Sequence, residues 1–224
     1  MRIGVISDLH GNVPALEKVL DLIDTDRIFC LGDLVGIGPD PAGVVRTVMN
    51  EERIRSVRGN HDHNAVHGTA FGPIPDSRRK EHHTWVRSQL SDDQAEFLKG
   101  LPTSIIEEGI HFTHAHPSHI GPNVPYYHRP EANVLDEYYK DVSGDMLVFG
   151  HTHRHLDITG SRRYFNPGAV GAQNEGMAQY AVLDIDDGIV RIERGEIPYD
   201  IEWIRQEIRS KGTIHAESII RNFY

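Results

Sequence analysis

The sequence predicts an α/β fold, because strand-like and helical patterns alternate along its N-terminal part. Residues 2–7 form an apolar run, and residues 13–23 then repeat apolar side chains at helical spacing. The same succession returns at residues 27–31, 41–49 and 54–57. Strands that alternate with helices are typical of a parallel sheet built from βαβ units. With 224 residues, 38% of them hydrophobic, the chain is expected to form one domain rather than two.

Capping residues mark where helices begin. Asn12 and Pro14 supply start signals for the first helix, and Asp40 caps the second. Further along, Ser91-Asp92-Asp93-Gln94 has the pattern of a capping box, which predicts a helix that ends near Gly100.

The later part of the chain is rich in strand patterns. Strands are expected at 104–107, 110–113, 146–149, 155–158, 164–166, 179–185 and 188–194. Those from residue 146 onward are expected to form a second sheet, mixed or antiparallel. A helix at 201–211 and a weakly helical tail follow. The single domain at 1–224 therefore divides into a core at 1–194 and a C-terminal helical extension at 195–224.

Two segments lack periodicity and are predicted to be loops of undetermined role. Residues 63–80 carry turn residues, and residues 116–130 are rich in Pro, Gly and His. Four basic or imidazole side chains lie in or beside the first segment, where a polar helical face explains them as well as a functional role does: Arg78, Arg79, His82 and His83.

The charge balance disfavours nucleic acid and anionic membranes as partners. The chain has 23 basic and 33 acidic residues, for a formal charge of −10. No apolar run approaches the ~20 residues of a membrane span. Because a strand pattern begins at residue 2, no room remains for a signal peptide, and we expect a cytoplasmic protein. The only cysteine, Cys30, cannot form an internal disulfide, and a homo-oligomer stays possible.

Polar side chains suited to metal binding follow several of the predicted strands. In open α/β sheets, sites form where strands end and loops begin. The candidate ligands are Asp8, His10, Asp33, Asn60, His114, His151 and His153. Oxygen and imidazole donors without a thiolate suit two divalent transition metals such as Mn, Fe or Zn, with Mg or Ni also possible.

One carboxylate could join two ions. Asp33 can bridge two cations, and a pair about 3.5–4 Å apart stabilises both the attacking and the leaving oxygens of an in-line displacement. The predicted chemistry is therefore hydrolysis of a phosphate ester.

The same residues resemble the motifs of the calcineurin-like metallophosphoesterases, in particular the small single-domain bacterial and archaeal group. The matching motifs, in order, are Asp8-x-His10, Gly32-Asp33, Gly59-Asn60-His61-Asp62, His114 and Gly150-His151-x-His153. The similarity runs from residue 1 to about 185 and includes the turn at 166–171. It implies a four-layer αββα sandwich of two mixed sheets flanked by helices, with a dinuclear metal site at the strand C-terminal ends.

The resemblance also assigns roles to individual residues. It implies that one metal is bound by Asp8, His10, Asp33 and His153, and the other by Asp33, Asn60, His114 and His151. A hydroxide that bridges the metals would be the nucleophile, and His61 would protonate the leaving alkoxide as general acid. We expect Asp62 to be structural.

Two departures from the family pattern leave the substrate open. Where protein serine/threonine phosphatases have an Asp and an Arg in the second motif, this chain has Gly36 and Ile37. Arg58 could clamp a phosphate or form a buried ion pair, and Asn60 and Arg129 are further candidate substrate contacts.

Three functions remain possible. Because His61 is retained, we expect a phosphomonoesterase that acts on a phosphorylated small molecule. The alternative is a phosphodiesterase or a hydrolase of nucleotides or dinucleoside polyphosphates. The third possibility is a non-enzymatic interaction module of the same fold.

Overall fold

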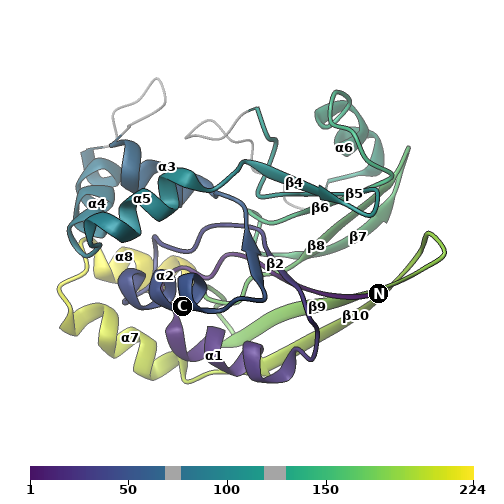
Figure 1. Ribbon diagram of the computed structural model, residues 1–224. Coiled ribbons are helices and arrows are strands. Elements are labelled where there is room, and N and C mark those ends of the chain that lie inside the picture. The colour runs from purple at the N-terminus through teal and green to yellow at the C-terminus, as the bar shows by residue number, and fades with distance from the viewer. Residues whose placement is uncertain (69–76, 119–129) are drawn as a thin grey trace.

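The computed structural model describes residues 1–68, 77–118 and 130–224 and contains two mixed sheets (Figure 1). In the described residues the first sheet has five strands, in the order β10 (Ile189–Pro198), β9 (Met177–Asp186), β1 (Arg2–Ile6), β2 (Ile28–Cys30) and β3 (Ile54–Ser56). β1, β2 and β3 are parallel, whereas β9 and β10 are antiparallel to their neighbours.

The second sheet lies against the first. Within the same described ranges its order is β4 (Ser104–Glu107), β5 (Ile110–Thr113), β6 (Met146–Phe149), β8 (Arg163–Pro167) and β7 (His155–Thr159). β5, β6 and β8 are parallel, and β4 and β7 pair antiparallel at the two edges.

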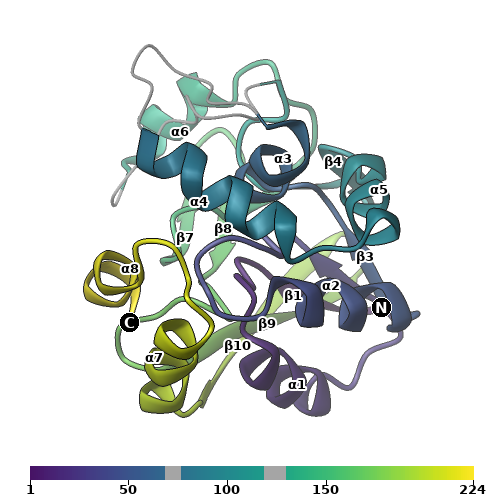
Figure 2. The ribbon, with the colours of Figure 1, turned by 90° about the vertical axis from the view of Figure 1, so that its left-hand side faces the viewer.

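Helices cover the outer faces of both sheets (Figures 1 and 2). α1 (Val13–Leu22), α2 (Pro41–Asn50), α7 (Ile201–Ser210) and α8 (Ala216–Phe223) lie on the side of the first sheet, and α6 (Ala132–Tyr138) lies over the second. α3 (Asn60–His67), α4 (Ser77–Ser88) and α5 (Asp92–Gly100) lie together at one end of the molecule (Figure 1). Buried side chains of α1, α2, α7 and α8 share one apolar cluster with the outer face of the first sheet. Side chains of α6 join a separate cluster on the outer face of the second sheet. The layers are therefore helix, sheet, sheet and helix, as the family resemblance implied.

A third apolar cluster fills the space between the two sheets. Val5 and Phe29 of the first sheet pack with Phe112 and Val148 of the second. The rings of Phe29 and Phe112 stack with centroids 4.1 Å apart. This packing brings the C-terminal ends of β1, β2, β5 and β6 to the same edge, which positions the loops that follow them.

Many local predictions are confirmed. Asn12 caps α1, Asp40 caps α2, and Ser91 opens α5 with the expected capping box. The strands expected at 104–107, 110–113 and 146–149 have the expected bounds, and the ends of the other strands shift by at most four residues. β10 continues to Pro198, so the expected division at 194/195 falls inside a strand. The short helix α6, held by the burial of Leu135 and Tyr139, had no signal in the sequence pattern.

The predicted sheet partner of the last two strands is wrong. β9 and β10 do not join the second sheet, because β9 pairs antiparallel with β1, with Ile3 opposite Leu183. Ala181, Leu183 and Ile185 thereby face the core between the sheets. Alternating apolar residues identify a strand but not its partner, so the sequence could not settle this pairing.

The predicted loop at 63–80 is also wrong over most of its described length. Residues 60–67 form α3, and α4 begins at Ser77. Neither helix has a strong apolar stripe; α3 contacts both α4 and α5. Residues 69–76, and residues 119–129 of the second predicted loop, lie outside the described residues.

In the described part of the chain, no helix combines the length and the apolarity needed to cross a bilayer.

Candidate metal centre

The turns after the strands hold most candidate ligands in a strained backbone conformation. Among the described residues, eight non-glycine residues have positive φ, and five of them are predicted ligands: Asp8, His10, Asp33, His151 and His153. Their φ angles lie between 44° and 68°. Such backbone conformations cost of order 1–3 kcal/mol each and cluster at functional sites. These turns therefore lower the stability of the folded protein, and the conformation that they adopt positions the five ligand side chains.

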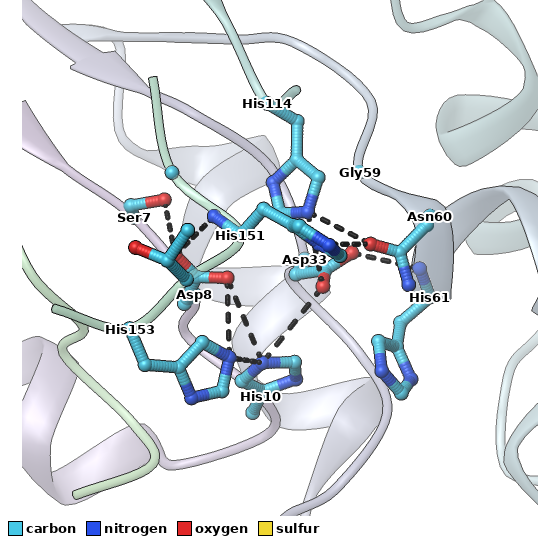
Figure 3. A network of polar contacts seen from close by, with 12 residues as sticks. Ser7, Asp8, His10, Asp33, Gly59, Asn60, His61, His114, His151 and His153 are labelled. Atoms are coloured by element: carbon cyan, nitrogen blue, oxygen red, sulfur yellow. Dashed lines mark hydrogen bonds and ion pairs between the residues drawn. The ribbon is translucent and has the colours of Figure 1, made fainter. Parts of the chain in front are cut away.

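One group of ligands surrounds the point where Asp8, His10 and His153 meet (Figure 3). His10 Nε2 lies 2.9 Å from His153 Nε2, and Asp8 Oδ1 lies 3.4 Å from His153 Nε2 and 3.8 Å from His10 Nε2. Ligand atoms that each lie about 2.1 Å from one ion are roughly 3.0–3.5 Å apart. The three donor atoms are thus spaced nearly as the ligands of one metal ion are.

A second group surrounds the point where Asp33, Asn60, His114 and His151 meet (Figure 3). Asn60 Oδ1 lies 2.9 Å from His114 Nε2 and 2.8 Å from His151 Nδ1. Asp33 Oδ2 lies 3.3 Å from His114 Nε2. The two nitrogens and two oxygens therefore form a compact set of donors.

Asp33 belongs to both groups. Its Oδ2 atom lies 3.8 Å from His10 Nε2 of the first group, in addition to its contact with His114. Its Oδ1 atom accepts a hydrogen bond from the backbone N–H of His61, at 2.7 Å. One oxygen is thus fixed by the backbone while the other faces both ligand groups, which is the arrangement that a bridging carboxylate needs.

Backbone carbonyls orient two of the imidazoles. His10 Nδ1 donates to Val35 O at 3.1 Å, and His114 Nδ1 donates to Leu31 O at 2.8 Å. Each bond directs Nε2 to the centre, and metal-binding histidines almost always have such a partner.

A buried carboxylate, Asp62, ties two of the turns together. It accepts hydrogen bonds from the backbone N–H groups of Asp33, Val35 and Gly59, at 2.9–3.1 Å. Gly59 has to be a glycine, because a Cβ there would collide with the Asp33 carboxylate. Burial and the Asp33 carboxylate raise the pKa of Asp62 to about 7. Asp62 is therefore structural, as expected, and lies at the start of α3.

The electrostatics of the cluster suit a bound cation. Burial, with help from His153, lowers the pKa of His10 to about 4, and burial together with His114 lowers that of His151 to about 4. Neutral imidazoles are the form that binds a metal. Burial also lowers the pKa of His114, but the Asp33 carboxylate outweighs it and raises that pKa to about 9. A proton on His114 therefore supplies the positive charge that a metal ion would bring beside Asp33.

The carboxylate of Asp8 has one oxygen that is free to bind a metal ion. Asp8 Oδ2 accepts hydrogen bonds from Ser7 Oγ at 2.6 Å and from the His151 N–H at 3.1 Å. Asp8 Oδ1 is buried and accepts no hydrogen bond from any described residue. A buried carboxylate oxygen without a hydrogen bond is costly, and a cation bound by the first ligand group would offset that cost.

His61 lies beside the first group. Its ring meets the ring of His10 edge to face, with centroids 5.0 Å apart, and a ring nitrogen comes within 4.8 Å of donor atoms of His10 and Asp33. Burial lowers its pKa well below the usual value. A Cβ at Gly36 would lie only 2.6 Å from His61 Nδ1, so the glycine makes room for the ring.

The candidate substrate contacts are distributed differently. Asn60 lies in the cluster, but the guanidinium of Arg58 donates to the carbonyl of Lys99 at the end of α5. Ile37 is buried in the apolar cluster beneath the helices. Arg129 lies outside the described residues.

Sequence patterns missed two residues that support the ligands. Ser7 directly precedes Asp8 and bonds its carboxylate, a role that its position at a strand end could have suggested. Phe223, at the end of α8, lies against the ring of His153 with centroids 6.0 Å apart. No sequence signal indicated this contact, because 70 residues separate the two side chains along the chain.

Comparison with known proteins agrees with this geometry. A family profile described as "Calcineurin-like phosphoesterase superfamily domain" matches residues 1–188. The chain belongs to this superfamily. It is 31% identical to uncharacterized protein MJ0912 of Methanocaldococcus jannaschii, over 92% of this chain and 91% of that protein. It is 30% identical to phosphodiesterase YfcE of Escherichia coli, over 83% of this chain and 89% of the relative.

A solved structure supports the same assignment. A metallophosphoesterase from Sphaerobacter thermophilus superposes with a TM-score of 0.79 and 28% identity, over 98% of this chain and 97% of that one. This calcineurin-like phosphoesterase is therefore a hydrolase, and its two ligand groups suit the divalent metals that the superfamily uses. The possibility of a non-enzymatic module is not supported.

Proposed function

We propose that this calcineurin-like phosphoesterase is a phosphodiesterase that works with two divalent metal ions. Asp8, His10 and His153 would hold one ion, Asn60, His114 and His151 would hold the other, and Asp33 would bridge them. When bound, such a pair supplies an acidified water as nucleophile and positive charge for the phosphoryl oxygens.

The proposal of a diester substrate rests on the residues around His61. In protein phosphatases an Asp orients the histidine and an Arg binds the phosphate, but here those positions are Gly36 beneath the ring and Ile37 in the core. Arg58 is bonded to the end of α5. A monoester carries up to two negative charges on phosphate, whereas a diester carries one, so a site without a placed arginine is better matched to a diester.

The chain's own residues prepare the rest of the reaction. The backbone N–H of His61 fixes Asp33, so the histidine side chain stands at a defined distance from both ligand groups. From there His61 would donate a proton to the leaving oxygen, a contribution typically worth ~10²–10⁴-fold. The similarity to a relative named phosphodiesterase supports the same reading.

A phosphomonoesterase is the second candidate, favoured by the presence of His61, because a poor alkoxide leaving group gains most from a proton donor. The two candidates separate in one experiment with manganese-loaded protein. We expect kcat/KM for bis(p-nitrophenyl) phosphate to exceed that for p-nitrophenyl phosphate by at least about tenfold, or about 1.4 kcal/mol in transition-state stabilisation. EDTA-treated protein is the control, and a faster reaction with the monoester would reject the diesterase proposal.

A further inference from the structure

A cavity lies between α3 and α4, which are neighbours at one end of the molecule (Figure 2). Its volume is about 280 Å³, near the small end of the range for small-molecule sites. The lining side chains that bear on its chemistry are Asn64, His67, Lys80, His83 and Arg87.

The charge of this cavity contrasts with that of the whole chain. None of the described residues that line it is acidic. Over residues 77–88, α4 carries four basic residues and one acidic residue, in a protein with a formal charge of −10. Arg87 pairs with Asp92 at 2.8 Å, but Lys80 is exposed and makes no ion pair with a described residue. Lys80 is therefore available to an anion that enters the cavity.

The cavity wall also has unused hydrogen-bonding capacity. Asn64 is only 7% exposed, and its Oδ1 atom has no hydrogen-bond partner among the described residues. The Nδ1 atom of His83 is buried and likewise has none in the same part of the chain. A buried polar atom without a partner destabilises the folded protein. A bound ligand with hydroxyl groups would satisfy these atoms.

His61 links this cavity to the metal centre. Its ring contacts His10 on one side, and on the other it lies 5.5 Å from the ring of His83, measured between centroids. Within α3, His61 and Asn64 are three residues apart and so share a face of the helix. His61 does not itself line the cavity, but it lies between His10 of the metal centre and His83 of the cavity wall.

The geometry of the displacement reaction suggests what the cavity could bind. In an in-line displacement the leaving group departs on the side opposite the nucleophile. If His61 protonates the leaving oxygen, the leaving group must lie beside His61, next to the cavity wall formed by His83. The cation Lys80 then favours a leaving group that carries negative charge of its own.

We propose that the cavity between α3 and α4 binds the leaving group of the substrate, and that this leaving group is itself phosphorylated and carries hydroxyl groups, as a nucleotide does. The inference rests on the proposed function, because it uses the role of His61 and the position of the metal ions. It identifies Lys80 and Asn64 as residues that determine specificity.

A charge reversal tests the inference. Diadenosine tetraphosphate can release a leaving group that carries phosphate and hydroxyl groups. Bis(p-nitrophenyl) phosphate releases p-nitrophenol or p-nitrophenolate, which carries no phosphate. For Lys80→Glu we expect kcat/KM to fall about tenfold with diadenosine tetraphosphate and less than about twofold with bis(p-nitrophenyl) phosphate. Lys80→Arg keeps the charge and should restore most of the loss. Arg46→Glu, an exposed position on α2, is the matched control for net charge.

The outcomes separate the two proposals. An equal loss with both substrates, or the same loss in Arg46→Glu, would overturn the leaving-group site and leave the diesterase intact. Hydrolysis of bis(p-nitrophenyl) phosphate without any hydrolysis of diadenosine tetraphosphate would do the same. Manganese-loaded protein that hydrolyses neither substrate would reject the proposed function, and the leaving-group site with it.

Discussion

The turns that carry the metal ligands and the α3–α4 pair differ in how firmly hydrogen bonds hold their polar groups in place. In the ligand turns, neighbouring loops bond to one another, as Asp8 N–H donates to Gly32 O and Gly171 N–H donates to Asp8 O. In α3 and α4, by contrast, polar atoms of Asn64 and His83 are buried without hydrogen bonds from described residues. The ligand turns also leave a buried atom, Asp8 Oδ1, unbonded by described residues, but there the surrounding loops are fixed to one another by backbone bonds.

The largest effect should follow from removing the residue on which the ligand turns converge. Because Asp33 faces both ligand groups, Asp33→Ala should release both ions and lower kcat by at least about 10³-fold. Elemental analysis after dialysis and the rate with bis(p-nitrophenyl) phosphate would measure these losses. Asp21→Ala, at an exposed position on α1, is the control. Retention of two ions by Asp33→Ala would show that the carboxylate does not bridge them.

A smaller and more selective effect is expected on the leaving-group side. His61→Ala should keep both metal ions but lower kcat by about 10²-fold with an alkyl leaving group, and by much less with p-nitrophenolate, which needs little protonation. The ratio of the two rates and the metal content are the measurements. Loss of one ion would contradict this division, because His61 lies close enough to His10 and Asp33 to be a ligand.

The smallest effect concerns the support of a ligand. Ser7→Ala removes the 2.6 Å hydrogen bond to Asp8 Oδ2 but leaves the bond from the His151 N–H. We expect the manganese concentration for half-maximal activity to rise about tenfold, with kcat at saturating metal nearly unchanged. Titration of the metal-free protein with Mn²⁺ measures both values. An unchanged titration curve would show that the backbone bond alone orients Asp8.

The same contrast explains what could be predicted from the sequence. Each ligand follows a recognisable apolar strand, so the positions of Asp8, Asp33 and His114 were visible as a local pattern. α3 was not visible, because the contacts of its buried Asp62 with the Asp33 and Val35 N–H groups exist only in the folded chain. Helices built on such distant polar contacts leave no apolar stripe for a sequence pattern to detect.

Strand partners and packing contacts between distant residues could not be predicted from the sequence for a related reason. The alternation in β9 fits either sheet, and only the packed interior selects β1 as its neighbour. The contact of Phe223 with His153 likewise depends on where α8 lies once the sheets have formed. The sequence shows that Gly36 stands where protein phosphatases have an Asp. It does not show that the absence of a side chain at Gly36 makes room for the His61 ring.

The central place of β1 has a consequence for how the protein folds. β1 pairs with β2 on one side and with β9 on the other, and the Asn12 side chain donates to Gly171 O, 159 residues further along the chain. Contacts between residues so far apart in sequence are slow to form, because closing a long chain segment costs entropy before the contact stabilises the fold. The loop after β1 can therefore reach its final shape only after the chain has been synthesised well past residue 171. We expect metal loading to follow this late closure.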